Sequence, residues 1–154
     1  MASIISIAYS PPTEVPRPKD HYHRVPATEA MLLADRGIET DRKGKGGDRQ
    51  LSIMSAATLA ILREQGFRTS PGEMGEQIVL EGLDVDNLPA GSQIKLGTTA
   101  IVEVVEPRTG CDRFERIQGK HKKLVRGRFG VIARVIVSGK IALGDTVRVV
   151  EQDA

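Results

Sequence analysis

The sequence is poor in cysteine and in aromatic residues. Its 154 residues include one Cys, no Trp and only 3% aromatic residues. One thiol cannot form an internal disulfide, which excludes a small secreted scaffold held together by internal disulfides. With so few aromatic side chains, we expect the core to be aliphatic.

Long hydrophobic runs are missing as well. No apolar stretch approaches the roughly 20 residues of a membrane-spanning helix. The first residues, MASIISI, lack the positive charge and the long apolar segment of a signal peptide. We therefore expect a cytoplasmic protein without a membrane partner. The net charge of +2 does not by itself indicate nucleic-acid binding.

Glycine and proline are frequent, with 16 Gly and 8 Pro, and predict many turns between short elements. Alternating or β-branched apolar runs predict strands near 5–9, 30–33, 50–54, 78–80, 94–96, 100–105, 131–137 and 146–150. Ser138-Gly139 resembles a hairpin turn that leads from one strand to the next at Ile141.

Helices are few in this pattern. The main one is expected to begin after Ser55, a favourable N-cap, and to end near Glu64, before Gly66. A shorter one is expected from Cys111 to Gln118, ending at Gly119. Because strands do not alternate regularly with helices, we predict a mainly β fold. We expect a closed or partly closed antiparallel β-barrel with one main helix and short helical turns, forming one domain over residues 1–154.

The cysteine lies in a segment that favours chemistry. Cys111 follows a predicted strand and a Pro-Gly-containing turn, and it stands between Arg108 and Arg113. Guanidinium groups stabilise a thiolate, which can attack sulfur or bind a soft metal. The alternative is a buried cysteine that acts as a small hydrophobic residue.

Two basic segments form a second candidate site. Lys120–Arg128 contains no acidic residue, and Arg42, Lys43, Lys45 and Arg49 cluster upstream in a glycine-rich stretch. If they converge, they would bind an anion such as a phosphate. The alternative is that most of them are solvated loop charges. Arg49 and Arg128 flank predicted strands and are the better candidates for an inward role.

A third, weaker feature is the stretch Pro71–Ile78, in which glycines bracket acidic residues just before a strand. It predicts either an acid–base carboxylate or only a turn. Phosphate-binding loops, dinucleotide-binding motifs and zinc-type Cys/His clusters are absent from the sequence.

The order of these motifs resembles the MOSC domain, named after the C-terminal domain of molybdenum cofactor sulfurases. The resemblance is strongest over residues 37–149. The segments that carry it are 37–42, 48–53, 71–76, 81–91, 106–111, 127–135, 139–141 and 144–145. Each segment is short and unspecific, whereas the ordered set is fairly specific.

The resemblance implies a barrel similar to the barrel domain of pyruvate kinase. It also implies that Cys111 carries sulfur or ligates molybdenum, in sulfur transfer or in the reduction of N-hydroxylated compounds. The family's basic pocket holds the phosphate of the molybdenum cofactor. The matching residues are Arg49, Arg108 and Arg128, with Arg42 and Lys43 as further candidates. Asp112, next to the cysteine, is our own candidate for a residue that orients or binds substrate or cofactor.

We therefore expect a protein that binds molybdenum cofactor, carries sulfur on Cys111, or does both. Its partners would be a small-molecule cofactor or substrate and a sulfur-donor or redox protein. One alternative is a non-catalytic basic barrel that binds RNA or an acidic protein through Lys120–Arg128. The low aromatic content counts against RNA, because single-strand binders use aromatic stacking platforms. The other alternative is an adaptor in which Cys111 is inert.

Overall fold

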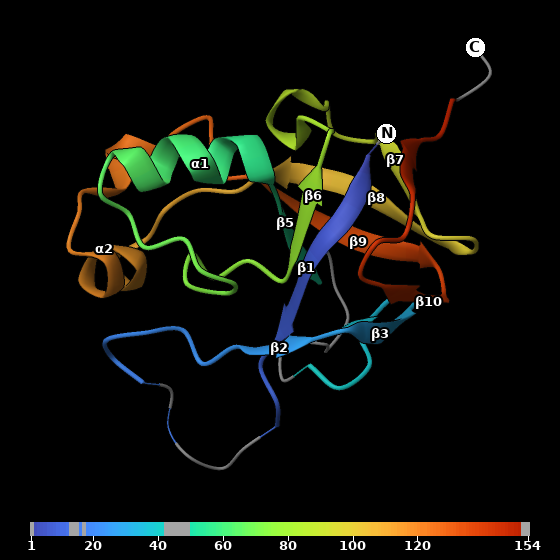
Figure 1. The fold of residues 1–154 in the computed structure, drawn as a ribbon, viewed down its shortest axis with the longest axis horizontal. Helices are drawn as coiled ribbons and strands as arrows, with labels where there is room; N and C mark the ends of the chain where they lie inside the picture. The colour runs from blue at the N-terminus through green and yellow to red at the C-terminus, as the bar shows by residue number, and fades with distance from the viewer. Residues whose placement is uncertain (1, 13–15, 17, 42–49, 152–154) are drawn as a thin grey trace.

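The computed structural model describes residues 2–12, 16, 18–41 and 50–151 and contains two helices and eleven strands in this part of the chain (Figure 1). The helices are α1 (Ala56–Glu64) and α2 (Asp112–Gln118), with short 3-10 turns at Val85–Asn87 and Lys122–Val125. The strands are β1 (Ser3–Tyr9), β2 (Val25–Ala27), β3 (Glu29–Leu33), β4 (Gly37–Ile38), β5 (Leu51–Ser55), β6 (Ile78–Glu81), β7 (Gln93–Leu96), β8 (Ala100–Pro107), β9 (Val131–Val137), β10 (Gly139–Ala142) and β11 (Val147–Val149).

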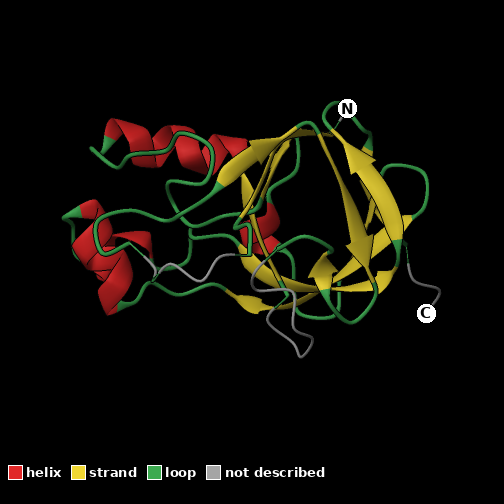
Figure 2. Ribbon diagram, turned by 90° about the horizontal axis from the view of Figure 1, so that it is seen from below, coloured by secondary structure: helices red, strands yellow, loops and turns green. Residues whose placement is uncertain are grey.

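Most of these strands belong to one curled sheet. Its order is β11-β7-β8-β9-β5-β6-β1-β2, and a smaller sheet has the order β10-β3-β4. All described ladders are antiparallel except β5 with β6, which run parallel because α1 lies between them in the chain. Figure 2 shows the strands curving around a common interior, with the helices gathered at one side. The predicted mainly β fold is confirmed.

Closure of the sheet into a barrel stays a prediction. The ladder ends at β11 and at β2. Between β1 and the segment before β11 the described residues form one isolated bridge, from Ser3 to Thr146, with backbone hydrogen bonds such as Ile4 N–H to Asp145 O at 3.0 Å.

The predicted hairpin at Ser138-Gly139 is wrong, because β10 pairs with β3 and not with β9. The register runs from Gly139 opposite Leu32 to Ala142 opposite Glu29. The chain changes sheets at this point. A Cβ on Gly139 would lie 2.6 Å from the Ala100 backbone nitrogen, so only glycine lets the two segments approach this closely.

The core has two parts. The interior of the curled sheet is aliphatic, as predicted, with Ile, Leu, Val and Ala as its buried residues. A second cluster between the sheet and the helices contains all three phenylalanines, with ring centroids 5.9 Å apart for Phe67–Phe114 and 4.7 Å for Phe114–Phe129. The prediction of an aliphatic core therefore holds for the sheet interior only. The aromatic cluster supports the segment that carries the cysteine.

Helix α1 has the predicted bounds, and α2 ends as predicted but begins at Asp112, one residue later than predicted, with Cys111 as its N-cap. Gly119 ends α2 in the left-handed conformation, with φ of 69°. Ser55 is the N-cap of α1, but its hydroxyl makes no capping bond. It donates to Leu83 O at 2.6 Å and accepts from Val85 N–H at 2.8 Å, so it ties β5 to the segment after β6. Within the described ranges, no helix is long and apolar enough to cross a membrane.

Candidate functional site

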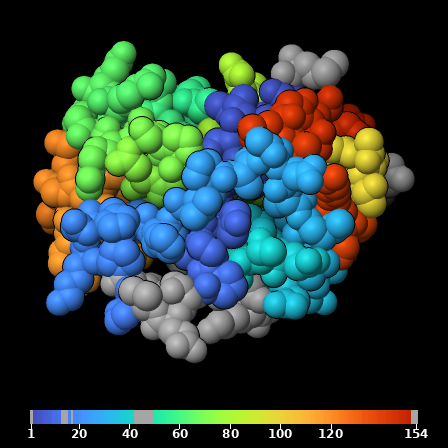
Figure 3. Space-filling view, turned by 60° about the horizontal axis from the view of Figure 1, so that its bottom comes forward, coloured from blue at the N-terminus to red at the C-terminus, as the bar shows by residue number. Residues whose placement is uncertain are grey.

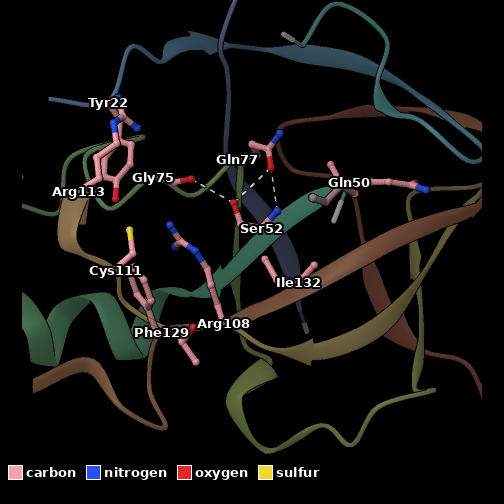
Figure 4. Close-up of a pocket in the computed structure, with 12 residues that line it drawn as sticks. Tyr22, Gln50, Ser52, Gly75, Gln77, Arg108, Cys111, Arg113, Phe129 and Ile132 are labelled. Carbon is pink, nitrogen blue, oxygen red and sulfur yellow. Dashed lines mark hydrogen bonds between the residues drawn. The ribbon is translucent and has the colours of Figure 1, made fainter. Parts of the chain in front are cut away.

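A pocket of about 350 Å³ opens where β5 and β8 approach the loop before α2 (Figure 4). Residues from five separate parts of the chain line it. They are Tyr22, Gln50, Leu51, Ser52, Gly75, Gln77, Arg108, Thr109, Cys111, Arg113, Phe129 and Ile132. No carboxylate is among these described lining residues, so two arginines dominate the charge of the pocket.

Cys111 is exposed and carries a free thiol. It is the N-cap residue of α2, and its carbonyl oxygen accepts the Glu115 N–H at 3.0 Å. In Figure 4 the sulfur projects from the loop into the pocket, toward Tyr22 and Arg108. The alternative of a buried, structural cysteine is therefore wrong.

Arg108 forms the half-buried inner side of the pocket. Its guanidinium stacks over the Phe129 ring, 3.8 Å from the centroid, and donates to Met74 O at 2.7 Å. Burial lowers the pKa of Arg108 to about 10, and the charges of Tyr22 and Glu76 act in the opposite direction. Arg108 therefore remains a cation at neutral pH and is held in one orientation.

Arg113 and Tyr22 form the outer side. The Arg113 guanidinium carbon lies 4.8 Å from the Tyr22 ring centroid, and one of its nitrogens donates to Pro18 O at 3.2 Å. Burial raises the pKa of Tyr22, an effect that the positive charge of Arg108 opposes. The segment before β2 is thus fastened to α2 by a cation–π contact and a hydrogen bond.

The turn at Gly75-Glu76 supports both sides of the pocket. Gly75 has φ of 80°, and a Cβ there would lie 2.6 Å from Arg108 and 3.0 Å from Tyr22. The Glu76 carboxylate is 1% exposed and accepts N–H groups from Gly72 at 2.9 Å and Met74 at 3.1 Å. Burial raises the pKa of Glu76. Glu76 does not line the pocket, so of the two roles predicted for this stretch, the structure supports the turn.

A buried polar network forms the floor. Gln77 Oε1 accepts from the Ser52 backbone N–H at 2.8 Å and from its hydroxyl at 3.2 Å, and Gln77 Nε2 donates to Asp41 at 2.6 Å. The Ser52 hydroxyl also contacts Gly75 O at 3.1 Å. Polar groups at this depth are paired, so the floor is rigid.

The predicted site residues are only partly brought together. Cys111 and Arg108 share the pocket, with Arg113 beside them. Asp112 is exposed, does not line this pocket, and pairs with Lys122 at 3.0 Å. The other predicted site residues, Arg42, Lys43 and Arg49, lie outside the described residues, as does Lys45.

Arg128 is not brought to the cysteine. Its guanidinium donates to Leu124 O at 3.0 Å and to the Gln65 side chain at 2.8 Å, near the end of α1. The Lys120–Arg128 stretch instead contributes to a neighbouring pocket of about 340 Å³. The lining residues of that pocket are Pro107, Arg108, Thr109, Gly110, His121, Lys122, Lys123, Arg126 and Gly127.

Sequence reasoning missed Tyr22, Ser52 and Gln77 as pocket residues. Tyr22 lies in a proline-rich stretch without periodicity, so nothing in the sequence points to it. Ser52 and Gln77 did carry a signal, because each is a polar residue directly beside buried apolar strand residues, Leu51 and Ile53 for Ser52 and Ile78 for Gln77. Among the described residues, no group of three or more His, Cys, Asp or Glu could hold a metal ion.

A curled β sheet with an exposed cysteine between arginines defines a β protein with a positively charged, thiol-bearing pocket. The family model of the MOSC domain matches residues 30–148. The chain belongs to the MOSC domain family, which confirms the resemblance found in the sequence.

Individual relatives agree with this assignment. A protein named "Reductase" from Gibberella moniliformis is 33% identical over 85 residues, which is 53% of this chain. This chain spans only 15% of the length of that reductase.

Solved structures resemble the whole described fold. YiiM from Geobacillus stearothermophilus matches with a TM-score of 0.75 and 21% identity, over 98% of this chain and 76% of its own. The YuaD protein from Bacillus subtilis matches with a TM-score of 0.75 and 19% identity, over 96% and 94%. YiiM from Escherichia coli matches with a TM-score of 0.72 and 20% identity, over 99% and 71%. At these identities the similarity establishes the fold alone.

Proposed function

We propose that this MOSC protein uses Cys111 to carry sulfur, to hold molybdenum cofactor, or to pass sulfur to that cofactor. The observation that carries the proposal is the exposed Cys111 thiol, which shares a pocket with Arg108 and Arg113 and with no carboxylate among the described lining residues. Cations of this kind stabilise a sulfur anion at the reacting atom.

Sulfur loading would be a thiol–persulfide exchange. The Cys111 thiolate attacks the terminal sulfur of a donor persulfide, R–S–SH. A sulfur–sulfur bond forms at Cys111, the donor's sulfur–sulfur bond breaks, and the donor leaves as the thiolate R–S⁻. No net oxidation or reduction occurs, so the step needs only a persulfide donor. The new Cys111 persulfide then releases its S–H proton to solvent. Arg108 and Arg113 stay protonated and offset the resulting negative charge on the terminal sulfur.

The donor set also fits molybdenum cofactor. One soft thiolate, Cys111, suits a metal that arrives with ligands of its own, and Arg113 would hold the cofactor's phosphate. The pocket volume of about 350 Å³ lies at the lower end of the range for small-molecule sites. When bound, the cofactor would supply the redox chemistry for reducing N-hydroxylated compounds.

The test is the intact mass and metal content of protein purified anaerobically from cells that make molybdenum cofactor. We expect molybdenum, or a species about 32 Da heavier that corresponds to one added sulfur. The adduct and the metal should be absent from Cys111→Ala and from Cys111→Ser, which keeps the size and polarity of the side chain. Wild-type protein with a bare, metal-free mass would contradict the proposal.

One observation favours a second candidate function, the binding of an acidic protein segment. In the pocket formed by the 120–128 stretch, Lys123 and Arg126 are exposed and have no acidic partner among the described residues. Binding of poly-glutamate that weakens steeply with salt, and that is lost in Lys123→Ala/Arg126→Ala, would support this function. Equal or tighter binding of an oligoribonucleotide would instead indicate RNA, and no binding to either would remove both.

A further inference from the structure

Among the polar groups of the pocket that the proposed chemistry does not use is the hydroxyl of Tyr22. Tyr22 lies in the segment between β1 and β2, and the family match begins only at residue 30. Figure 3 shows this segment in blue at the molecular surface, bordering the orange region that includes α2. The wall that faces Cys111 is therefore built from a part of the chain outside the matched domain.

The Tyr22 ring is held in place from two sides. Arg113 covers one side, with its guanidinium carbon 4.8 Å from the ring centroid. Gly75 packs against another side so closely that a Cβ on it would lie 3.0 Å from the ring carbon that bears the hydroxyl. Arg24, two residues on, donates to Gly75 O at 3.0 Å and anchors the segment. These contacts fix the direction of the hydroxyl.

The hydroxyl itself makes no hydrogen bond with any described residue. Figure 4 shows it pointing toward the sulfur of Cys111, and both residues line the same pocket. The negative charge of Cys111 raises the pKa of Tyr22, after the larger effect of burial, so the two groups are electrostatically coupled. A phenol keeps its proton at neutral pH and is available as a donor.

We propose that the Tyr22 hydroxyl donates a hydrogen bond to the terminal sulfur of a persulfide on Cys111 and so holds the carried sulfur in the pocket. This inference rests on the proposed sulfur-carrier function. The added sulfur extends about 2 Å beyond the thiol, into the space between Cys111 and Tyr22. The Arg108 guanidinium already donates to Met74 O and stacks on Phe129, so Tyr22 adds a neutral donor on the other side of the sulfur.

The test measures the exchange equilibrium between Cys111 and glutathione persulfide in the full chain. The two products are the Cys111 persulfide and glutathione thiolate. The fraction of protein that carries sulfur is measured by intact mass, because the persulfide form is about 32 Da heavier than the free protein. A hydrogen bond to a charged acceptor corresponds to at least about a tenfold change in the equilibrium constant. We expect Tyr22→Phe to lower the constant by about that factor, while it keeps the ring against Arg113 and Gly75.

Tyr9→Phe is the matched control, because Tyr9 lies in β1 at the edge of the sheet core and does not line the pocket. It should leave the exchange constant unchanged, and the melting temperatures should show that both variants are folded. A Tyr22→Phe constant equal to that of wild type would overturn the role of Tyr22 while leaving the sulfur-carrier function intact. A wild-type protein that takes up no sulfur would overturn the carrier function, and with it this inference.

Discussion

Gly130 packs against β5 and contacts the backbone of Arg108 in the pocket, and replacing it with alanine should lower the stability of the protein. Gly130 has φ of 78°, and a Cβ there would overlap the Ile53 carbonyl oxygen and lie 2.8 Å from Met54 Cγ. The first obstacle is backbone of β5 and cannot turn away. The Gly130 carbonyl also accepts the Arg108 N–H at 3.0 Å, so any shift moves the arginine of the pocket.

The expected loss has two contributions. A left-handed conformation costs a residue with a side chain about 1–2 kcal/mol, and forcing a methyl group into a packed site costs about 1–3 kcal/mol. Gly130→Ala should therefore lower the free energy of unfolding by about 2–5 kcal/mol. Gly127→Ala is the matched control, because Gly127 has φ of 77° and nothing within 4 Å of its Cβ position. It should lose only about 1–2 kcal/mol.

The assay is urea unfolding followed by far-UV circular dichroism, which suits a chain without tryptophan. The dependence on urea should keep its slope in both variants, so the shift in midpoint reports the stability difference. If Gly130→Ala loses no more stability than Gly127→Ala, the close packing of Gly130 against β5 does not limit this position, and the reasoning fails.

Two further predictions concern buried polar groups. Ser55→Ala should lower the free energy of unfolding by about 1–3 kcal/mol, because the Leu83 carbonyl and the Val85 N–H both lose their hydrogen-bond partner. A loss under about 0.5 kcal/mol in the same urea assay, as is typical of a surface substitution, would contradict this prediction. For Glu76, burial raises the pKa of the carboxyl group in the folded protein above its ordinary value of 4.5. The contribution of this group to stability is therefore fully present below pH 4.5 and is lost as pH rises through the folded pKa. The stability of wild type relative to Glu76→Gln should therefore decrease over that window, and parallel pH profiles would contradict the assigned direction.

Local patterns predicted much of the fold because they have local causes. The alternation of Ala100, Val102 and Val104 indicated a strand with one buried face, and β8 has that burial. Gly119 ended α2 because glycine adopts the left-handed conformation easily. The short strand β2 was missed because it contains Pro26, which is tolerated there since β2 lies at the edge of the sheet.

The parts that could not be predicted depend on contacts between distant segments. The pairing of β10 with β3 joins segments that lie far apart in the chain, and the close approach of Gly139 to Ala100 accompanies it; no local motif encodes either contact. For the site, Cys111 and Arg108 were predicted from their shared turn, whereas Tyr22 reaches the pocket only through contacts with Arg113 and Gly75. Arg128 was predicted to point inward because it flanks a strand, yet its bond to Gln65 holds it near the end of α1.

The connection between β1 and β2 gives this protein a replaceable component. Its two ends are fixed by the pairing of Tyr9 with Val25, so its length can change without altering the register of the sheet. The entropic cost of a longer loop grows only slowly with length. Exchanging this stretch would thus offer protein engineers a way to change what reaches Cys111 while the sheet and its core stay as they are. Libraries aimed at new thiol chemistry would vary the residues around Tyr22 first.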